Sequence, residues 1–419
     1  MYNLTTLDNG LRVASERDDD CMTAAFAIAV DVGARNEELR QGGLSHLLEH
    51  MAFKGTRKLN AKQIAEAFDV MGGNVNAYTS HEHTVYYAKV LREYADDALN
   101  LLCDIVADSK FDAEELERER QVILQEIAMH NDTPDDLVFD LYQEMAFGDA
   151  PLGRSILGDP KRVAKFSRED LVEYTRTHYQ PERLVVAGAG AVDHAATTAI
   201  VQQHFGTRKN EVKKPKMPAA KYHGGEKTLE KELEQVQLVL GFEGVQSGHP
   251  DYYVAQVFST ILGGGMSSRL FQEIRERRGL AYSVSSFASG YQDIGLIGMY
   301  AGTTVEHLPE LTGALKDVLS SCKENVTDSE LLRAKNQLKA NLVMTRESSG
   351  AIAEWIARHL HVYGRYRTAE ELLAEIEKVT IADVARIAER CLATKKPVVA
   401  ALGPIGSVKN AKLTAKLAA

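Results

Sequence analysis

The hydrophobic and polar positions of the chain follow the same order twice. Small and apolar residues alternate with polar ones at 23–34 and again at 235–244, a period typical of strands. In each half a helical pattern that ends in glycine follows, at 43–55 and at 249–265. The matching order predicts that one fold occurs twice along the chain.

The remainder of each half continues in parallel: a second helix, a long strand or hairpin, a pair of helices and a closing Val-rich strand. In the first half these elements are expected at 61–73, 74–91, 94–111, 114–129 and 183–190, and in the second half at 267–279, 280–302, 308–324, 329–344 and 396–403. This succession predicts an α+β fold with two homologous α/β sandwich-type domains that arose by internal duplication.

The segment 207–227 is rich in Lys, Pro and Gly and has no apolar period, which is typical of a linker. The expected organisation is therefore an N-terminal domain at 1–206 and a homologous C-terminal domain at 228–419. Two unrelated α/β domains of similar size are the alternative to a duplication.

Composition excludes several classes of protein. The 419 residues are 44% hydrophobic and 26% charged, which is ordinary for a globular protein and excludes a disordered or low-complexity chain. No apolar run reaches 18 residues, so no membrane span is expected. The formal charge of −10 argues against a nucleic-acid partner.

Compartment is predicted from weaker signals. The four cysteines are scattered and form no CxxC pair, which favours free thiols in a reducing compartment. The first residues lack the basic and apolar regions of a secretory signal, and no transit-like start is apparent. A cytoplasmic location is expected, with the mitochondrial matrix as the alternative.

Side chains that can bind a metal or transfer a proton are concentrated in the first predicted helix of the chain. His46 and His50 are four residues apart, so both imidazoles project from one helical face and can meet one ion. Glu49 borders the same face, and together the three residues form an H-x-x-E-H motif. Two neutral imidazoles at this spacing suit Zn²⁺. A helix that merely carries two histidines on its surface, without a metal, would have the same sequence motif.

A third protein ligand is predicted on the helix at 114–129. Glu119 and Glu126 lie on its apolar stripe with Leu116, Ile123 and Ile127. A carboxylate on a buried face is costly unless it is paired or bound to metal. Spacing alone does not choose between the two acids; one would ligate the ion and the other would hold a ligand in place.

The second half provides an internal control for this site. Aligning the two halves places Glu126 opposite Asn341 and Glu119 opposite Ala334. The segment that corresponds to the His46 helix contains no histidine in its helical part. The sequence therefore predicts one zinc per chain, bound by the first half alone.

With these motifs in view, the chain resembles the M16 (pitrilysin, or inverzincin) family of zinc metallopeptidases, most closely its short, processing-peptidase-like members. The segments that carry the resemblance are GGLSHLLEHMAFKGT (42–56), GGNVNAYTSHEHTVYYA (72–88), ELERERQVILQEI (115–127) and SSRLFQEIRERRGLAYSV (267–284). They lie in both halves, so the resemblance covers essentially the whole chain. It implies that Glu126 is the distal ligand and Glu119 the supporting acid.

The resemblance also implies roles for residues that spacing does not connect. Arg275 and Tyr282 match the family's Arg and Tyr pair, which contacts substrate near the zinc. Asn76 and Ala77 match the family's substrate-binding strand beside the metal. His81 and His83, which alternate in the predicted strand around Glu82, are interpreted as outward polar residues whose role is open.

The function expected from residues and resemblance together is zinc-dependent endopeptidase activity on extended peptides or presequences, with Glu49 as general base. The family implies two halves that enclose a chamber like a clamshell, and a homodimer or a heterodimer with a related chain. The alternative is a non-catalytic structural or binding subunit of a related two-chain assembly. A metallohydrolase with a non-peptide substrate is a third hypothesis.

Overall fold

The computed structural model describes residues 1–213 and 217–408. The chain forms two compact units, and each draws on three separate stretches of sequence. Unit 1 consists of Met1–Ala128, Arg154–Pro218 and Met344–Tyr366, and unit 2 consists of Met129–Gly153, Ala219–Val343 and the chain from Arg367 onward. No helix among the described residues is both long and apolar enough to cross a membrane.

Unit 1 is built on a six-stranded sheet. In spatial order its strands are β1 (Tyr2–Thr6), β2 (Arg12–Arg17), β6 (Leu184–Gly190), β3 (Thr23–Val30), β5 (Thr84–Leu91) and β4 (Asn74–Thr79). Only the β2 and β6 pair is parallel, and every other pair in this sheet is antiparallel. The strand β4 is therefore at one edge, with a single strand partner among the described residues.

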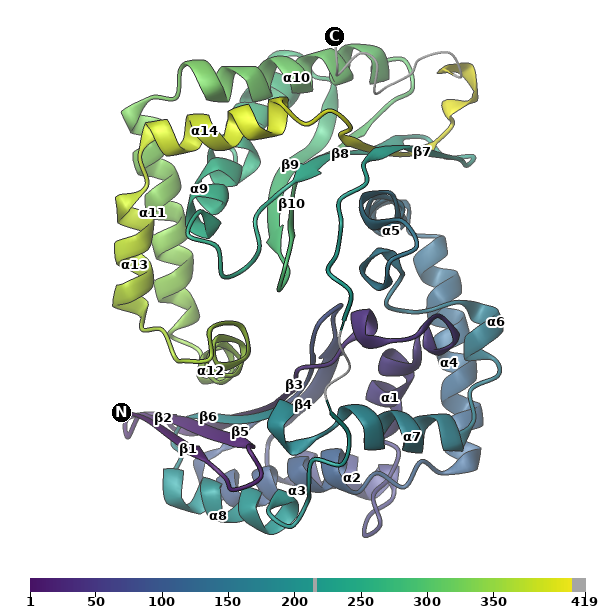
Figure 1. Cartoon of the computed structure of the whole chain (residues 1–419), viewed down its shortest axis with the longest axis vertical. Coiled ribbons are helices and arrows are strands. Elements are labelled where there is room, and N and C mark those ends of the chain that lie inside the picture. Colours follow the sequence, from purple (N-terminus) through teal and green to yellow (C-terminus); the bar gives the residue numbers. More distant parts are fainter. Residues whose placement is uncertain (214–216, 409–419) are drawn as a thin grey trace. The chain divides into compact units, whose positions relative to one another are not determined.

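Helices cover both faces of this sheet (Figure 1). One face carries α1 (Leu44–Ala52), α2 (Ala61–Val70), α3 (Ala95–Ala107), α4 (Ala113–Asn131), α6 (Pro160–Val163), α7 (Arg168–His178) and α8 (His194–Phe205). The opposite face is covered by α12 (Ser349–Tyr363), whose Ala353, Ile356 and Ala357 pack on the alanine-rich side of β3 and β6. Small residues on both surfaces let helix and sheet approach closely.

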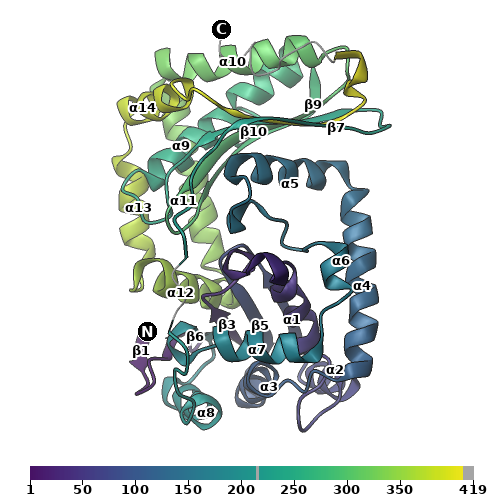
Figure 2. The same ribbon diagram turned by 45° about the vertical axis from the view of Figure 1, so that its right-hand side comes forward.

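Unit 2 repeats the plan with five strands. They are β7 (Gly225–Glu230), β11 (Val398–Gly403), β8 (Val236–Glu243), β10 (Gly295–Thr303) and β9 (Ala281–Gly290), in spatial order. The helices on one face are α9 (Tyr252–Gly263), a π-helix (Phe271–Arg277), α10 (Leu308–Glu324), α11 (Asp328–Thr345), α13 (Ala369–Lys378) and α14 (Ile381–Leu392). The opposite face is covered by α5 (Pro134–Phe147), as Figure 2 shows.

Short 3-10 helices lie in the connections of both units. Their bounds are Ala34–Asn36, Leu39–Gln41, Arg92–Tyr94, Pro151–Gly153, Pro181–Arg183 and Ile405–Val408. The second of them immediately precedes the turn into α1, so it shapes the entry to the helix that carries the H-x-x-E-H motif.

The predicted fold class is confirmed, because each unit is a sheet with helices on both faces and the two follow the same order of elements. The packing adds a feature that the repeat did not indicate. The helix α5 comes from the first half of the sequence but packs in unit 2, and α12 comes from the second half but packs in unit 1. The continuous domains 1–206 and 228–419 stay a prediction of where the sequence repeat begins and ends. The packed units differ from these ranges mainly because the segments that contain α5 and α12 are exchanged between them.

The predicted linker 207–227 contains the division between the units, which falls after Pro218. Its residues 214–216 lie outside the described residues. The strand β7 begins at Gly225, within the predicted linker, because Gly225 to Glu230 pair in parallel with β11. The last residues of the predicted linker, 225–227, therefore belong to a strand of unit 2.

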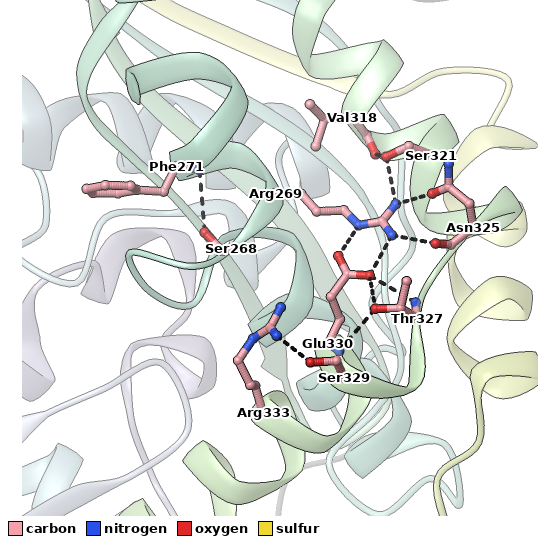
Figure 3. A network of polar contacts seen from close by, with 10 residues as sticks. All are labelled: Ser268, Arg269, Phe271, Val318, Ser321, Asn325, Thr327, Ser329, Glu330 and Arg333. Carbon is pink, nitrogen blue, oxygen red and sulfur yellow. Dashed lines mark hydrogen bonds and ion pairs between the residues drawn. The ribbon is translucent and has the colours of Figure 1, made fainter. Parts of the chain in front are cut away.

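A polar network fixes one corner of unit 2 (Figure 3). The Arg269 guanidinium donates to both carboxylate oxygens of Glu330, at 2.7 and 2.9 Å, and to the side chains of Ser321 and Asn325. This hydrogen bonding lowers the pKa of Glu330 to about 2. Because Arg269 lies two residues before the π-helix, the network ties that segment to the turn between α10 and α11.

Candidate metal centre

The helix α1 directs two imidazoles to one point. His46 and His50 are one turn apart, and their ring centroids are 4.7 Å from each other. A neighbouring side of α1 is anchored in the core of unit 1 by Leu44, Leu47 and Met51, all of which are buried. The apolar stripe thus orients the helix, and the histidines occupy the adjoining face.

Glu126 completes a group of three possible metal ligands. Its Oε2 lies 3.7 Å from Nε2 of His46 and 3.5 Å from Nε2 of His50. Zinc bonds of about 2.0–2.2 Å at tetrahedral angles put neighbouring ligand atoms about 3.3–3.6 Å apart. The two nitrogens and one oxygen therefore fit a single zinc ion with a small adjustment. Within 1–213 and 217–408, His46, His50 and Glu126 are the one group of three or more such side chains.

The protonation state of His46 also fits metal binding. Burial, and the neighbouring His50, lower the pKa of His46 to about 4. The imidazole is therefore neutral at neutral pH, and the neutral form is the one that can donate a lone pair to a cation.

Glu119 lies on the far side of His50 from Glu126. Its Oε2 is 3.0 Å from Nδ1 of His50, and its Oε1 is 2.6 Å from Nζ of Lys54. Burial opposes the ionised form, but the hydrogen bonds from His50 and Lys54 outweigh it and lower the pKa of the Glu119 carboxyl group. A carboxylate in this position fixes the ring of His50 with Nε2 directed toward Glu126.

Glu49 lies beside the three ligand candidates and is held by a residue that sequence reasoning missed. Its Oε2 accepts a hydrogen bond of 2.6 Å from the hydroxyl of Thr79, at the end of β4. Burial raises the pKa of Glu49, and the bond from Thr79 offsets part of that rise. Thr79 follows the predicted Asn76 and Ala77 strand closely, but its contact with Glu49 depends on the packing of β4 against α1.

The start of α1 is held by a second residue that the sequence did not reveal. The Glu37 carboxylate accepts from the backbone N–H of Gly43 at 2.9 Å and from that of Ser45 at 2.6 Å. Gly43 has φ +97°, and a Cβ there would lie 2.7 Å from the Leu157 carbonyl, so glycine is required. Because Gly43 has no side chain, the cap that a helix usually takes from its own first residue comes from Glu37.

The predicted strand residues lie at the sheet edge. Asn76 is exposed, whereas Ala77 is buried against the core of unit 1. The Asn76 side-chain oxygen accepts a hydrogen bond of 2.9 Å from the Ala77 N–H. On one side β4 pairs with β5, and on its other side no strand pairs with it in the described part of the chain.

Arg275 and Tyr282 contact each other within unit 2. The Arg275 guanidinium lies 4.2 Å from the centroid of the Tyr282 ring and 4.7 Å from that of Phe271. Its Nη1 also donates to the Tyr282 carbonyl at 3.3 Å. Tyr282 is 72% exposed, which is unusual for a large aromatic residue. Their role toward the metal ligands, which belong to unit 1, stays a prediction.

His81 and His83 do not alternate along a strand as predicted. They lie in the tight turn between β4 and β5, where the Ser80 hydroxyl accepts from the backbone N–H of Glu82 and His83. The His83 ring stacks on that of His361, with centroids 5.3 Å apart. Period-two alternation failed here because the strand ends at Thr79 and Ser80 begins a turn.

Comparison with known proteins now identifies the class. Residues 12–160 match the family model described as insulinase (peptidase family M16), and residues 165–338 match the one described as peptidase M16 inactive domain. The chain is 42% identical over 390 residues to an uncharacterized zinc protease of Rickettsia felis, covering 93% of this chain and 94% of that one. The chain belongs to the M16 family of zinc peptidases.

Other relatives and solved structures agree on the fold. An uncharacterized zinc protease of Bacillus subtilis is 37% identical over 411 residues, covering 98% of this chain and all of that one. The structure of a protease from Helicobacter pylori matches with a TM-score of 0.88 at 24% identity, covering 96% and 99% of the two chains. A chain of complex III2 from Candida albicans matches with a TM-score of 0.86 at 19% identity, covering 99% and 98%. At these identities the structures indicate a shared fold alone.

Proposed function

We propose that this protein is a zinc-dependent endopeptidase that hydrolyses extended peptides or presequences. The observation that carries the proposal is the convergence of His46, His50 and Glu126, beside Glu49 on the helix that also carries the two histidines. Two imidazoles and one carboxylate are a ligand set that catalytic zinc uses while it keeps a position open for water. The relatives that are named zinc proteases support zinc as the ion.

The protein's own residues would have separate roles in peptide hydrolysis. When bound, zinc supplies polarisation of the scissile carbonyl and acidification of a water molecule. Glu49 accepts a proton from that water and later delivers it to the leaving amine. Thr79 would hold the Glu49 carboxylate in position for this transfer through its hydroxyl bond to Oε2.

Substrate binding is proposed at the free edge of β4. A peptide in extended conformation can add to a sheet edge through main-chain hydrogen bonds, which place few demands on its side chains. Asn76 and Ala77 would form part of this edge. Arg275 and Tyr282 would hold the substrate or the oxyanion, which fits the exposure of the tyrosine.

Activity and metal content together test this proposal. One zinc per chain by elemental analysis and zinc-dependent cleavage of an internally quenched peptide are expected. Glu49→Gln should abolish cleavage and keep the zinc, because it removes the base and leaves the three ligands. Zinc binding without turnover of any member of a peptide library would instead favour a structural or binding subunit. A subunit of that kind would not need the three ligand candidates and Glu49 together.

We further infer a homodimer, or a heterodimer with a related chain, that acts in the bacterial cytoplasm, with the mitochondrial matrix as the alternative. The bacterial relatives support the first location. Light scattering on the purified chain should give twice the monomer mass, and a monomer that is fully active alone would contradict the dimer.

A further inference from the structure

Two carboxylates on one helix contact the same candidate ligand, His50. Glu119 and Glu126 lie two turns apart on α4, and both reach His50. Glu126 meets the nitrogen that faces His46, at 3.5 Å, whereas Glu119 meets the other ring nitrogen, at 3.0 Å. Either acid would satisfy zinc chemically, so something else must hold Glu119 away from the ion.

Lys54 occupies the remaining oxygen of Glu119. It comes two residues after the end of α1, and its ammonium nitrogen lies 2.6 Å from Oε1 of Glu119. The side chain of Glu119 is 7% exposed and that of Lys54 is 31% exposed. Each oxygen of Glu119 therefore has its own partner, His50 on one side and Lys54 on the other.

We propose that Lys54 is a positioning residue that assigns the two acids their roles at the metal. By binding Oε1, its ammonium group keeps Glu119 turned toward Nδ1 of His50 and away from the ion. Glu126 is then the carboxylate that completes the set with His46 and His50. This inference rests on the proposed zinc site and adds a residue to it.

The number of negative charges at the site explains why Glu119 needs the positive charge of Lys54. Glu49, Glu119 and Glu126 bring three carboxylates to a site that binds one divalent cation. A buried carboxylate without a cationic partner is costly, so Glu119 without Lys54 would relieve that cost by turning to the metal. His50 would then lose the hydrogen bond that orients its ring, and such losses lower metal affinity by about 10- to 100-fold.

The chain contains a matched control for Lys54. Four residues further along, Lys58 makes an ion pair of 2.7 Å with Asp104, whose side chain is also nearly fully buried. Among the described residues, no hydrogen bond or ion pair joins Asp104 to His46, His50 or Glu126. Lys58→Met thus removes the same kind of surface lysine from the same kind of buried acid, without touching the metal site.

The experiment measures metal binding instead of turnover. Wild type, Lys54→Met, Lys54→Arg and Lys58→Met are stripped of metal, checked for equal thermal unfolding, and titrated with zinc against a chromophoric chelator. The visible spectrum of each protein loaded with Co²⁺ reports the geometry of the ligands. We expect about 10- to 100-fold weaker zinc binding and a changed cobalt spectrum in Lys54→Met alone, with recovery in Lys54→Arg.

A double mutant separates this role from a general effect of charge. Because Lys54 acts through Glu119, adding Lys54→Met to Glu119→Gln should cause no further loss of zinc affinity. Wild-type affinity and spectrum in Lys54→Met would overturn the inference and leave the zinc site intact. Additive losses in the double mutant would overturn it as well. A wild type that binds no zinc would overturn the site and the role of Lys54 together.

Discussion

Replacing Glu37 by glutamine should change how the stability of unit 1 depends on pH. Glu37 is 3% exposed and caps α1 through the N–H groups of Gly43 and Ser45. Burial raises the pKa of Glu37 to about 7, and the two backbone hydrogen bonds and the nearby Arg154 offset only part of that rise. Glutamine has nearly the same shape and carries no charge at any pH.

The magnitude follows from the difference between the folded and unfolded pKa. A group whose folded pKa is raised stabilises the fold fully below its unfolded pKa of 4.5, and this contribution is lost as the pH rises through 7. The difference corresponds to about 3 kcal/mol at 1.36 kcal/mol per pKa unit. Glutamine offers one acceptor oxygen instead of two, which costs about 1 kcal/mol at every pH.

The single tryptophan makes the measurement specific. Trp355 lies in α12, which packs in unit 1, so its fluorescence reports the unfolding of that unit. Urea unfolding of the metal-free wild type and of Glu37→Gln is followed at intervals from pH 4.5 to pH 8. The free energy of unfolding of the variant, relative to the wild type, should rise by about 3 kcal/mol over this range.

Taking the difference between two proteins removes the contribution of the histidines, which both share. Parallel curves for wild type and variant would show that Glu37 has an ordinary pKa in the folded protein. The reasoning from its burial would then be refuted, even though the hydrogen bonds to α1 could still be correct.

Three further outcomes are expected. Thr79→Val should lower kcat about tenfold or more with zinc content unchanged, because Glu49 loses its positioning bond; steady-state kinetics with elemental analysis measures both. Glu126→Ala should lose zinc in equilibrium dialysis, because two imidazoles alone hold the ion weakly. The pKa of Glu330 is lowered to about 2, so its pairing with Arg269 stabilises unit 2 above pH 4.5, and this stabilisation is lost as the pH falls toward 2. In acid titrations followed by circular dichroism, Glu330→Gln should remove up to about 3 kcal/mol of this pH dependence of stability.

Local spacing was sufficient for part of the candidate site. His46 and His50 share a face because they are four residues apart on one helix, and this relation does not depend on the rest of the fold. Glu126 could be narrowed to two candidates, since an acid on a buried stripe needs a partner. The structure then places Glu126 at the Nε2 atoms and Glu119 at Nδ1 of His50.

The residues that hold the site in place could not be found in this way. Glu37, Lys54 and Thr79 each act through contacts between segments that periodicity treats as separate. The same limit applies to α5 and α12. An apolar stripe predicts that a helix packs on something, but it does not say which of two similar sheets receives it.

The exchange of these helices has a consequence for protein synthesis. When the ribosome has completed the last strand of the first sheet, β6, the helix that covers one of its faces has not yet been made. The alanine-rich side of β3 and β6 stays open to water until residue 363 has been added. The early half of the nascent chain must therefore wait for the late half, and an incomplete chain presents an adhesive apolar surface to its neighbours.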